Sequence, residues 1–359
     1  MNITTEQVIN ALRYVDDPDL KKDLITLNMV KDIEVKGNQV SFTVVLTTPA
    51  CPMKDMIHNA CTNAILHYVS KDAIVKINMT AQVTSKKEKD ETTLKDVKNI
   101  IAVASGKGGV GKSTIAANLA LGLSKQGAKV GLVDADIYGP SQHIMFGVER
   151  ESPGPGEFNG QKKMSPVISY GVKLNSIGFM AAPHQAIALR GPMATKALNQ
   201  LFYDTVWGEL DYLIVDLPPG TGDIQISLCS SIPVTGAVVV CTPQAVAISD
   251  ARKGISLFQL EQLNIPVLGL IENMAWFTPA ELPENKYYIF GKDGVKDLSE
   301  ELNLPLLAQI PLVQSVREAA DIGRPAVLQD NTDLSLAFIE VAQNVAQQVA
   351  IQNSQLILN

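Results

Sequence analysis

The first 84 residues mix the two hydrophobic periods that distinguish helices from strands. Apolar residues three and four apart predict helices, and apolar residues that alternate with polar ones predict strands. Gly37-Asn38 separates two alternating runs, which is typical of a two-residue hairpin turn. The pattern therefore predicts a small α+β domain over residues 1–84. Its expected elements are a helix over 5–15, strands over 29–35 and 39–46, a helix over 53–69 and a strand over 74–83.

From residue 98 onward, short apolar runs alternate with longer stretches of helical periodicity. Strands that alternate with helices predict an α/β fold, a doubly wound and mostly parallel sheet with helices on both faces. A helix is expected over 113–126. Residues 151–163 hold two prolines and three glycines and are expected to form a surface loop. The expected strands are 100–104, 129–133, 212–215, 236–241, 267–271 and a short one before Ile310.

A charged segment, SKKEKDETTLKDVKN at residues 85–99, lies between these two parts. Such a composition is typical of a solvated linker, although a charged helix face is an alternative. We therefore expect a domain over 1–84, a linker over 85–97 and a second domain over 98–359. A length of 359 residues is comfortable for two domains.

The overall charge restricts the partners. Thirty basic residues against 37 acidic ones give a net charge of −7, which argues against a general binder of nucleic acid or of anionic membranes. The longest uncharged stretch, 224–249, contains prolines and a glycine and does not resemble a membrane span. The chain begins without the basic and apolar regions of a signal peptide, so a reducing cytoplasm is the expected compartment.

Residues 106–113 read GKGGVGKS, which matches the phosphate-binding pattern GxxxxGK[ST]. The motif follows an apolar strand and opens a helix, as a P-loop must. Its glycines let backbone N–H groups turn toward phosphate oxygens, and the helix N-terminus adds positive potential. Lys112 is expected to reach the β- and γ-phosphates of ATP, and Ser113 to bind Mg²⁺. The expected nucleotide-binding residues of the loop are Gly106, Lys107, Gly108, Gly109, Val110, Gly111, Lys112, Ser113 and Thr114.

Carboxylates follow two later strands that should end at the same edge of the sheet. Asp134 and Asp136 follow the strand 129–133, and Asp216 follows the strand 212–215. An aspartate at a strand end beside a P-loop commonly orders Mg²⁺ through water, and we assign this role to Asp216. Gly220 is expected to sense the γ-phosphate through its N–H, and Asp136 to orient the attacking water. The alternative for Asp134 or Asp136 is that it only caps a helix.

The four cysteines include no CxxC pair, so neither a disulfide framework nor a zinc knuckle is indicated. Cys51 lies in TTPACP, residues 47–52, between a strand and a helix N-terminus that would lower the pKa of its thiol. The alternative is a small buried residue at a turn. Cys229 lies on an apolar helix and Cys241 ends an apolar strand, so both are expected in the core. Cys61 lies ten residues beyond Cys51.

Four stretches together resemble one family. They are the loop with its second lysine, Lys107, DADIYGPS at 134–141, DLPPGTGD at 216–223 and ENM at 272–274. This combination resembles the Mrp-type P-loop ATPases, iron–sulfur cluster carriers within the Min/Par and nitrogenase-iron-protein class. The resemblance implies Mg²⁺-dependent ATP hydrolysis in a nucleotide-sandwich homodimer, where Lys107 touches the partner's phosphates. It implies that Asn273 contacts adenine and that the segment from Pro311, followed by LVQSVREA, closes over the base.

The first 84 residues resemble the small iron–sulfur assembly domain that often precedes these ATPases, and the resemblance implies a functional role for Cys51. The expected partners are a second copy of the chain and iron–sulfur apoproteins or assembly factors. One feature departs from the family pattern. The family places a CxxC pair between the ENM and IFG motifs, whereas residues 275–288 contain no cysteine. Any cluster must then be held by Cys51, by other cysteines or by a partner, because thiolates are its usual ligands.

Two other functions remain open at this stage. A Min- or Par-like positioning ATPase would bind membrane or DNA, but the chain has no Lys or Arg after Arg324. A slow ATPase that serves as a scaffold and holds no cluster is the other alternative.

Overall fold

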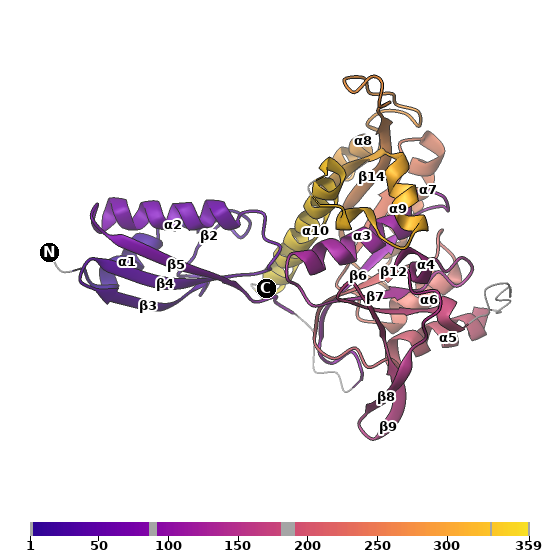
Figure 1. The fold of residues 1–359 in the computed structure, drawn as a ribbon, viewed down its shortest axis with the longest axis horizontal. Helices are drawn as coiled ribbons and strands as arrows, with labels where there is room; N and C mark the ends of the chain where they lie inside the picture. Colours follow the sequence, from indigo (N-terminus) through magenta and orange to yellow (C-terminus); the bar gives the residue numbers. More distant parts are fainter. Residues whose placement is uncertain (1–2, 86–91, 181–190, 331, 358–359) are drawn as a thin grey trace. The chain divides into compact units, whose positions relative to one another are not determined.

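The computed structural model describes residues 3–85, 92–180, 191–330 and 332–357 (Figure 1). The chain divides into two compact units. The first comprises Met1–Lys86 together with Ala346–Asn359, and the second comprises Lys87–Val345. None of the helices in the described ranges is long and apolar enough to cross a membrane.

The first unit is built on a three-stranded sheet in the order β3-β4-β5. Antiparallel β3 and β4 meet at a tight turn where Lys36 pairs with Gln39 and Gly37 has a φ of 65°. Parallel β4 and β5 are joined through α2, because parallel strands need a crossover connection. Alternate residues of β4 are buried from Val40 to Leu46, and α1 and α2 pack on this apolar face. The elements are α1 (Thr5–Leu12), β1 (Asp16–Asp17), β2 (Lys22–Asp23), β3 (Val30–Lys36), β4 (Gln39–Leu46), α2 (Lys54–Tyr68) and β5 (Ile74–Ala81).

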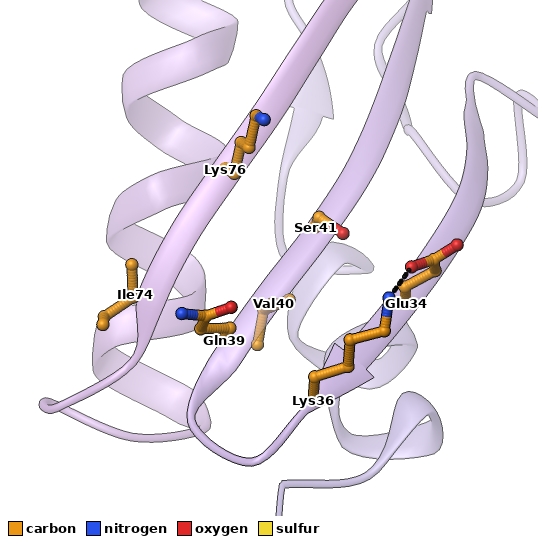
Figure 2. Close-up of a pocket in the computed structure, with 7 residues that line it drawn as sticks. All are labelled: Glu34, Lys36, Gln39, Val40, Ser41, Ile74 and Lys76. Atoms are coloured by element: carbon orange, nitrogen blue, oxygen red, sulfur yellow. Dashed lines mark hydrogen bonds and ion pairs between the residues drawn. The ribbon is translucent and has the colours of Figure 1, made fainter.

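The opposite face of this sheet carries polar residues and a shallow pocket of about 250 Å³. Figure 2 shows that its lining side chains come from all three strands, with a helix behind the sheet. Lys36 and Glu34 form an exposed ion pair at 2.9 Å in this pocket. The end of α10 (Asp333–Ile357) also belongs to this unit, where Gln347 Nε2 donates to Asp19 Oδ1 at 2.6 Å.

The second unit contains an eight-stranded sheet in the order β10-β11-β7-β12-β6-β13-β14-β15. Every neighbouring pair is parallel except β10 with β11, so the predicted doubly wound and mostly parallel α/β sheet is confirmed. All six strands expected from the sequence belong to it. Its strands are β6 (Val97–Ala104), β7 (Val130–Asp134), β10 (Val167–Ser169), β11 (Val172–Ser176), β12 (Leu210–Asp216), β13 (Gly236–Cys241), β14 (Val267–Phe277) and β15 (Leu306–Leu312).

Helices pack on both faces of this sheet (Figure 1). On one face, α5, α6, α7 and α8 share a single apolar cluster with the strands, which includes Leu198, Phe258 and Leu298. On the other face α3 packs so closely against α10 that a Cβ on Gly122 would lie 2.9 Å from that of Ala342. The helices are α3 (Lys112–Lys125), α4 (Gln142–Met145), α5 (Gly191–Tyr203), α6 (Asp223–Ser231), α7 (Ala245–Phe258), α8 (Gly294–Glu301) and α9 (Gln314–Asp321), with 3-10 turns η1 (Ile177–Met180) and η2 (Ala326–Leu328).

The prediction of a surface loop over 151–163 is wrong. These residues lie largely in an antiparallel hairpin, β8 (Gly154–Phe158) and β9 (Gln161–Ser165), which Figure 1 shows projecting from the second unit. Asn159 and Gly160 have φ values of 51° and 76°, as a two-residue hairpin turn with two positive φ angles requires. This Asn-Gly pair was the signal in the sequence, and the prolines and glycines around it concealed it.

The sequence predicted a solvated linker over 85–97, but Thr93 and Leu94 are buried. Leu94 is fully buried in the apolar cluster of the second unit, and the Thr93 hydroxyl donates to the Phe202 carbonyl at 2.9 Å. Val97 already belongs to β6. Residues 86–91 of the expected linker lie outside the described residues.

Candidate nucleotide-binding site

The predicted site residues lie at the carboxyl ends of adjacent strands. β12 lies between β6 and β7, and Asp216 at its end pairs in register with Val103 and with Asp134. The loop that follows β6 therefore lies beside both carboxylates. In open α/β sheets this edge is where ligands bind.

The loop between β6 and α3 has the backbone that only glycine provides at several positions. Gly109 and Gly111 have φ values of 84° and 83°. A Cβ on Gly106 would lie 2.2 Å from the backbone carbon of Asp250, and one on Gly111 would lie 2.2 Å from Asn273 Nδ2. The loop is therefore packed closely against α7 and β14, and it leads into the N-terminus of α3, where a helix can bind an anion.

Lys112 is buried, and its ammonium group is surrounded by oxygen atoms. Nζ forms an ion pair with Asp216 Oδ1, lies 3.5 Å from Asp136 Oδ2 and contacts Ser113 Oγ at 3.4 Å. The structure thus brings together residues that the sequence analysis predicted from the P-loop motif and from two later strand ends. A cation is stabilised in this cluster because two carboxylates and a hydroxyl face it.

The same atoms are suited to Mg²⁺, which nucleotide chemistry implies. Hard carboxylate and hydroxyl oxygens are the donors that this ion prefers. The ammonium of Lys112 shows that a positive charge is held between Asp216, Asp136 and Ser113. Ser113 and Asp216 would hold the ion, and Lys112 would then be released toward phosphate oxygens.

Asp216 is completely buried, and both of its oxygens have partners. Lys112 contacts Oδ1, while Gln142 Nε2 donates to Oδ2 at 2.8 Å. The sequence analysis did not identify Gln142. Gln142 belongs to no sequence motif, and only the fold places it beside a strand end that lies 74 residues away.

Asp134 is completely buried and accepts hydrogen bonds from four donors. Its Oδ2 accepts from the backbone N–H of Ser141, the backbone N–H of Gln142 and the hydroxyl of Ser176, each at 2.9 Å. Its Oδ1 accepts from the Asp136 N–H at 3.3 Å. Burial, together with the nearby charge of Asp216, raises the pKa of Asp134 to about 7. Two of these donors, the N–H groups of Ser141 and Gln142, lie at the start of α4. Asp134 therefore caps this helix, which was one of the two alternatives that the sequence left open.

Asp136 differs from Asp134 because it retains access to solvent. Its side chain is 13% exposed, and burial raises the pKa of its carboxyl above the ordinary value, although Lys112 opposes this shift. A carboxylate with a raised pKa at the mouth of a phosphate site is a candidate for proton transfer or for orienting water.

Two of the remaining predicted residues, Gly220 and Asn273, contact the same loop. The Gly220 N–H, expected to sense phosphate, donates to the Ser105 carbonyl at 2.9 Å, so this conformation does not present it to a ligand. Asn273, expected to contact adenine, is nearly buried, and its Nδ2 donates to the Val110 carbonyl at 2.8 Å. Its Oδ1 and second N–H could still contact a base. Pro311 lies near the end of β15, directly before Leu312.

Lys107 differs from Lys112 in its contacts. Within the described parts of the chain, its side chain forms no ion pair and no hydrogen bond to another side chain. Its carbonyl accepts from the Ser105 hydroxyl at 2.9 Å, which fixes the backbone of the loop at this position. The two lysines of the loop are therefore in different environments, one buried among carboxylates and the other unpaired.

The cysteines are free thiols, and three of the four are buried. Cys229 and Cys241 lie in the core of the second unit, as predicted, and Cys61 lies in the core of the first. Cys51 is partly exposed in the loop before α2. The expectation of a lowered thiol pKa is wrong, because burial, with smaller contributions from Asp19 and Asp17, raises the pKa of Cys51 to about 11.

The structure also describes residues 275–288, where the resemblance led us to expect a CxxC pair. Phe277 at the end of β14 exchanges two backbone hydrogen bonds with Tyr287, each at 2.8 Å. The ammonium of Lys286 lies 4.1 Å from the centre of the Trp276 ring. Within the described ranges, no group of three or more His, Cys, Asp or Glu side chains is arranged to hold a metal ion.

Comparisons with known proteins agree with this geometry. Residues 96–349 match the ParA family described as NUBPL iron-transfer P-loop NTPase, and residues 5–78 match the iron–sulfur cluster assembly protein family. An iron–sulfur cluster carrier protein of Synechocystis is 44% identical, over 97% of this chain and 99% of its own length. The carrier protein of that name from Escherichia coli is 40% identical, over 95% of this chain and 91% of its own length.

A solved structure agrees as well. A nucleotide-binding protein from Archaeoglobus fulgidus in complex with ADP is 33% identical and superposes with a TM-score of 0.58. The match covers 69% of this chain and 94% of that protein. The resemblance predicted from the four motifs is thereby confirmed, and with it the P-loop fold.

Proposed function

The chain belongs to the NUBPL iron-transfer P-loop NTPase family, and we propose that it couples ATP hydrolysis to the carriage of iron–sulfur clusters through the residues described above. The observation that carries the proposal is the buried cluster of Lys112, Ser113, Asp136 and Asp216 at the end of the P-loop. These residues present one cation and two carboxylates where the phosphates and the metal of a nucleotide would meet.

Nucleotide binding is assigned to the loop and α3. Backbone N–H groups from Gly106 to Thr114 would surround the phosphates, with the positive end of the α3 dipole behind them. On binding, Lys112 leaves Asp216 and contacts the β- and γ-phosphate oxygens. Mg²⁺, when bound, neutralises charge on those oxygens. Ser113 would bind the ion directly and Asp216 through water, while Asn273 and the segment from Pro311 would bound the adenine.

Hydrolysis is assigned to Asp136. Its carboxylate is near Lys112 and reaches solvent, whereas Asp134 has both oxygens committed to donors of the chain. We therefore assign the orientation of the attacking water to Asp136 and the positioning of the 134–142 segment to Asp134. Gly220 would release the Ser105 carbonyl before its N–H could contact the γ-phosphate.

The active form is proposed to be a homodimer with two nucleotides between the subunits. The side chain of Lys107 supports this proposal, because a lysine that has no partner among the described residues is available to contact the partner's phosphates. A cation supplied across an interface would stabilise the charge of the transition state, as an arginine finger does.

The cargo is an iron–sulfur cluster, and its recipients are proposed to be apoproteins or assembly factors. Cys51 is the candidate ligand, because it is the partly exposed thiol while Cys61, Cys229 and Cys241 are each at most 4% exposed. One thiol per chain leaves a cluster short of ligands, so the others would come from a second copy, a client or a small thiol. The assembly-type unit around Cys51 would carry the cargo. Four free thiols also suit the reducing cytoplasm, which we propose as the compartment.

One observation favours a second candidate, a slow ATPase scaffold without a cluster of its own. The described residues contain no set of thiols that could hold a cluster within one chain. The positioning alternative is not favoured, since the acidic balance and the lack of basic residues after Arg324 oppose binding to DNA or anionic lipid.

Anaerobic reconstitution with iron and sulfide tests the assignment of the cargo. Iron counting and absorption spectra would be recorded for the wild type, for Cys51→Ala and for Cys61→Ala, which removes a buried thiol of the same unit. We expect labile cluster binding by the wild type and by Cys61→Ala, and none by Cys51→Ala. A stable cluster in Cys51→Ala would overturn the assignment, and the absence of iron in all three would favour the scaffold.

A further inference from the structure

Gln142 connects three parts of the nucleotide site although it lies outside every recognised motif. It is the first residue of α4 and is fully buried. Its Nε2 donates to Asp216 Oδ2 at 2.8 Å and to the Ser113 carbonyl at 2.9 Å, so both side-chain N–H groups are used. Its backbone N–H donates to Asp134 Oδ2 at 2.9 Å.

These bonds join β12, the start of α3 and the 134–142 segment at one point. Asp216 ends β12, Ser113 lies in the first turn of α3, and Asp134 ends β7. The remaining polar atom, Gln142 Oε1, is buried and has no hydrogen-bond partner within the described residues. The amide is therefore held in place by what it donates.

Nucleotide binding is expected to remove the partner of one Asp216 oxygen and to leave the partner of the other in place. Oδ1 is paired with Lys112, which must move to reach phosphate, whereas Oδ2 is paired with Gln142, which has no such role. When Lys112 leaves, the Gln142 amide is the donor that still fixes the carboxylate. It would then hold Asp216 in an orientation suited to Mg²⁺.

We propose that Gln142 is a positioning residue for the Mg²⁺ site, which orients the Asp216 carboxylate and fixes it to the backbone of Ser113. The inference rests on the proposed function in one respect, namely that Ser113 and Asp216 serve Mg²⁺. Gln142 is proposed to act through Asp216 and Ser113, to which its amide donates. Its effect is on the metal requirement, because misorientation of Asp216 weakens metal binding while the phosphate-binding loop stays intact.

The test is Gln142→Met, which keeps the length of the side chain and removes both donors. Met adapts well to buried sites, so the fold should be retained. Binding of ADP is measured by calorimetry in EDTA and then across a Mg²⁺ titration. We expect the half-saturating Mg²⁺ concentration to rise about 10-fold or more, a typical loss for a residue that supports a metal ligand. The affinity for ADP in EDTA should stay within about 2-fold, since the variant leaves Lys112 and the backbone N–H groups that are proposed to contact phosphate unchanged.

A matched control removes an amide of the same unit that lies away from the carboxyl ends of the strands. Asn344 on α10 donates to the Leu307 carbonyl at 2.8 Å, near the start of β15. Asn344→Leu should leave the Mg²⁺ requirement unchanged. If Gln142 serves only general stability, both variants should have a lower melting temperature, while Gln142→Met keeps the Mg²⁺ requirement of the wild type. That result would overturn the proposal.

A second variant covers the case in which Gln142→Met does not fold. Gln142→Asn keeps the amide but is one methylene shorter, so it cannot reach Asp216 and Ser113 together. An unchanged Mg²⁺ requirement in a folded Gln142→Asn would also overturn the proposal. Failure of the proposed function gives a different result, because the wild type itself would then bind ADP with no dependence on Mg²⁺.

Discussion

The ammonium of Lys112 and the carboxylate of Asp216 form an ion pair inside the protein, with side chains 6% and 0% exposed. The lysine that must bind phosphate is thus held by the carboxylate that is proposed to serve the metal. Removing one member of a buried pair leaves the other charge uncompensated, at a cost of about 3–5 kcal/mol. Exchange of this pair for phosphate and metal contacts is the local change that nucleotide binding requires.

Lys112→Ala should weaken ATP binding about 100-fold or more, because charged hydrogen bonds to two phosphates are lost. It should also destabilise the empty protein, since Asp216 loses its counter-ion. Lys107→Ala is the matched variant of the same loop. It should keep ATP affinity within about 3-fold and lose most hydrolysis, because its proposed target is the partner's phosphate. Calorimetry and phosphate release check both, and equal losses of affinity would contradict this division of roles.

Asp136→Asn should lower the rate of ATP hydrolysis about 10²- to 10⁴-fold, the usual effect of removing a group that accepts a proton from or orients the attacking water. ATP affinity should change little, because phosphate contacts come from the loop. Size-exclusion chromatography with ATP should then show a persistent dimer. A variant that hydrolyses ATP at the wild-type rate would transfer the role to another residue.

The sequence was sufficient for those parts of the site that are contiguous in the chain. The P-loop is a single motif whose spacing encodes its geometry, and Asp134 and Asp216 each end an apolar run that is visible by itself. Gln142 could not be predicted in this way. Its partners come from β12 and α3, and only the order β7-β12-β6 places them around it. The raised pKa of Cys51 was equally hidden, since it depends on burial and not on the neighbouring helix alone.

The fold was predictable where strands are apolar throughout and not where they are mixed. β11, which pairs with β7, alternates Val172 and Leu174 with Lys173 and Asn175, so it lacks the continuous apolar run by which the other parallel strands were recognised. Asn175 is nevertheless fully buried, because its amide donates to the Thr205 hydroxyl at 2.7 Å. A partner from a distant segment thus satisfies a polar residue that in the sequence looked exposed.

Leu94→Ala tests the revised boundary of the second unit. A solvated linker would tolerate this change, but a buried leucine in an apolar core should cost about 2–5 kcal/mol of unfolding free energy. Leu336→Ala, at a position 57% exposed on α10, is the control and should cost less than about 1 kcal/mol. Urea unfolding monitored by tryptophan fluorescence suits this test, because Trp207 is buried in the same cluster as Leu94. Equal midpoints for the two variants would restore the linker interpretation.

Asp134 predicts a pH dependence of stability. Its pKa is raised in the folded state, so between about pH 4 and pH 7 the folded protein holds a proton that the unfolded chain has released. The free energy of unfolding should therefore fall as the pH rises through this window. Asp134→Asn removes this titration. The free energy of unfolding of the wild type minus that of the variant should therefore decline, from about pH 4 to pH 7, by an amount on the order of 1 kcal/mol or more. Urea unfolding at several pH values measures it; a difference independent of pH would show that Asp134 is ionised throughout.

Cys51 should react slowly with iodoacetamide at neutral pH. The thiolate is the reacting form, and a pKa of about 11 makes it about 100-fold rarer than at the ordinary value of 9.0. The greater nucleophilicity of a more basic thiolate recovers about 10-fold of this, so the net rate should be about 10-fold below that of a free thiol. Mass spectrometry of peptides from the native protein would follow Cys51, with the buried Cys61 as the internal reference.

The pH dependence of this reaction bears on the cargo. The alkylation rate should keep rising above pH 9, because the folded environment favours the neutral thiol until its raised pKa is reached. Iron binding by Cys51 must then release a proton at neutral pH, so cluster loading should improve steeply as the pH rises from 7 to 9. Cys51→Ala should abolish both dependences. A Cys51 thiol that reacts at its full rate by pH 8 would show that the loop opens in solution and exposes it.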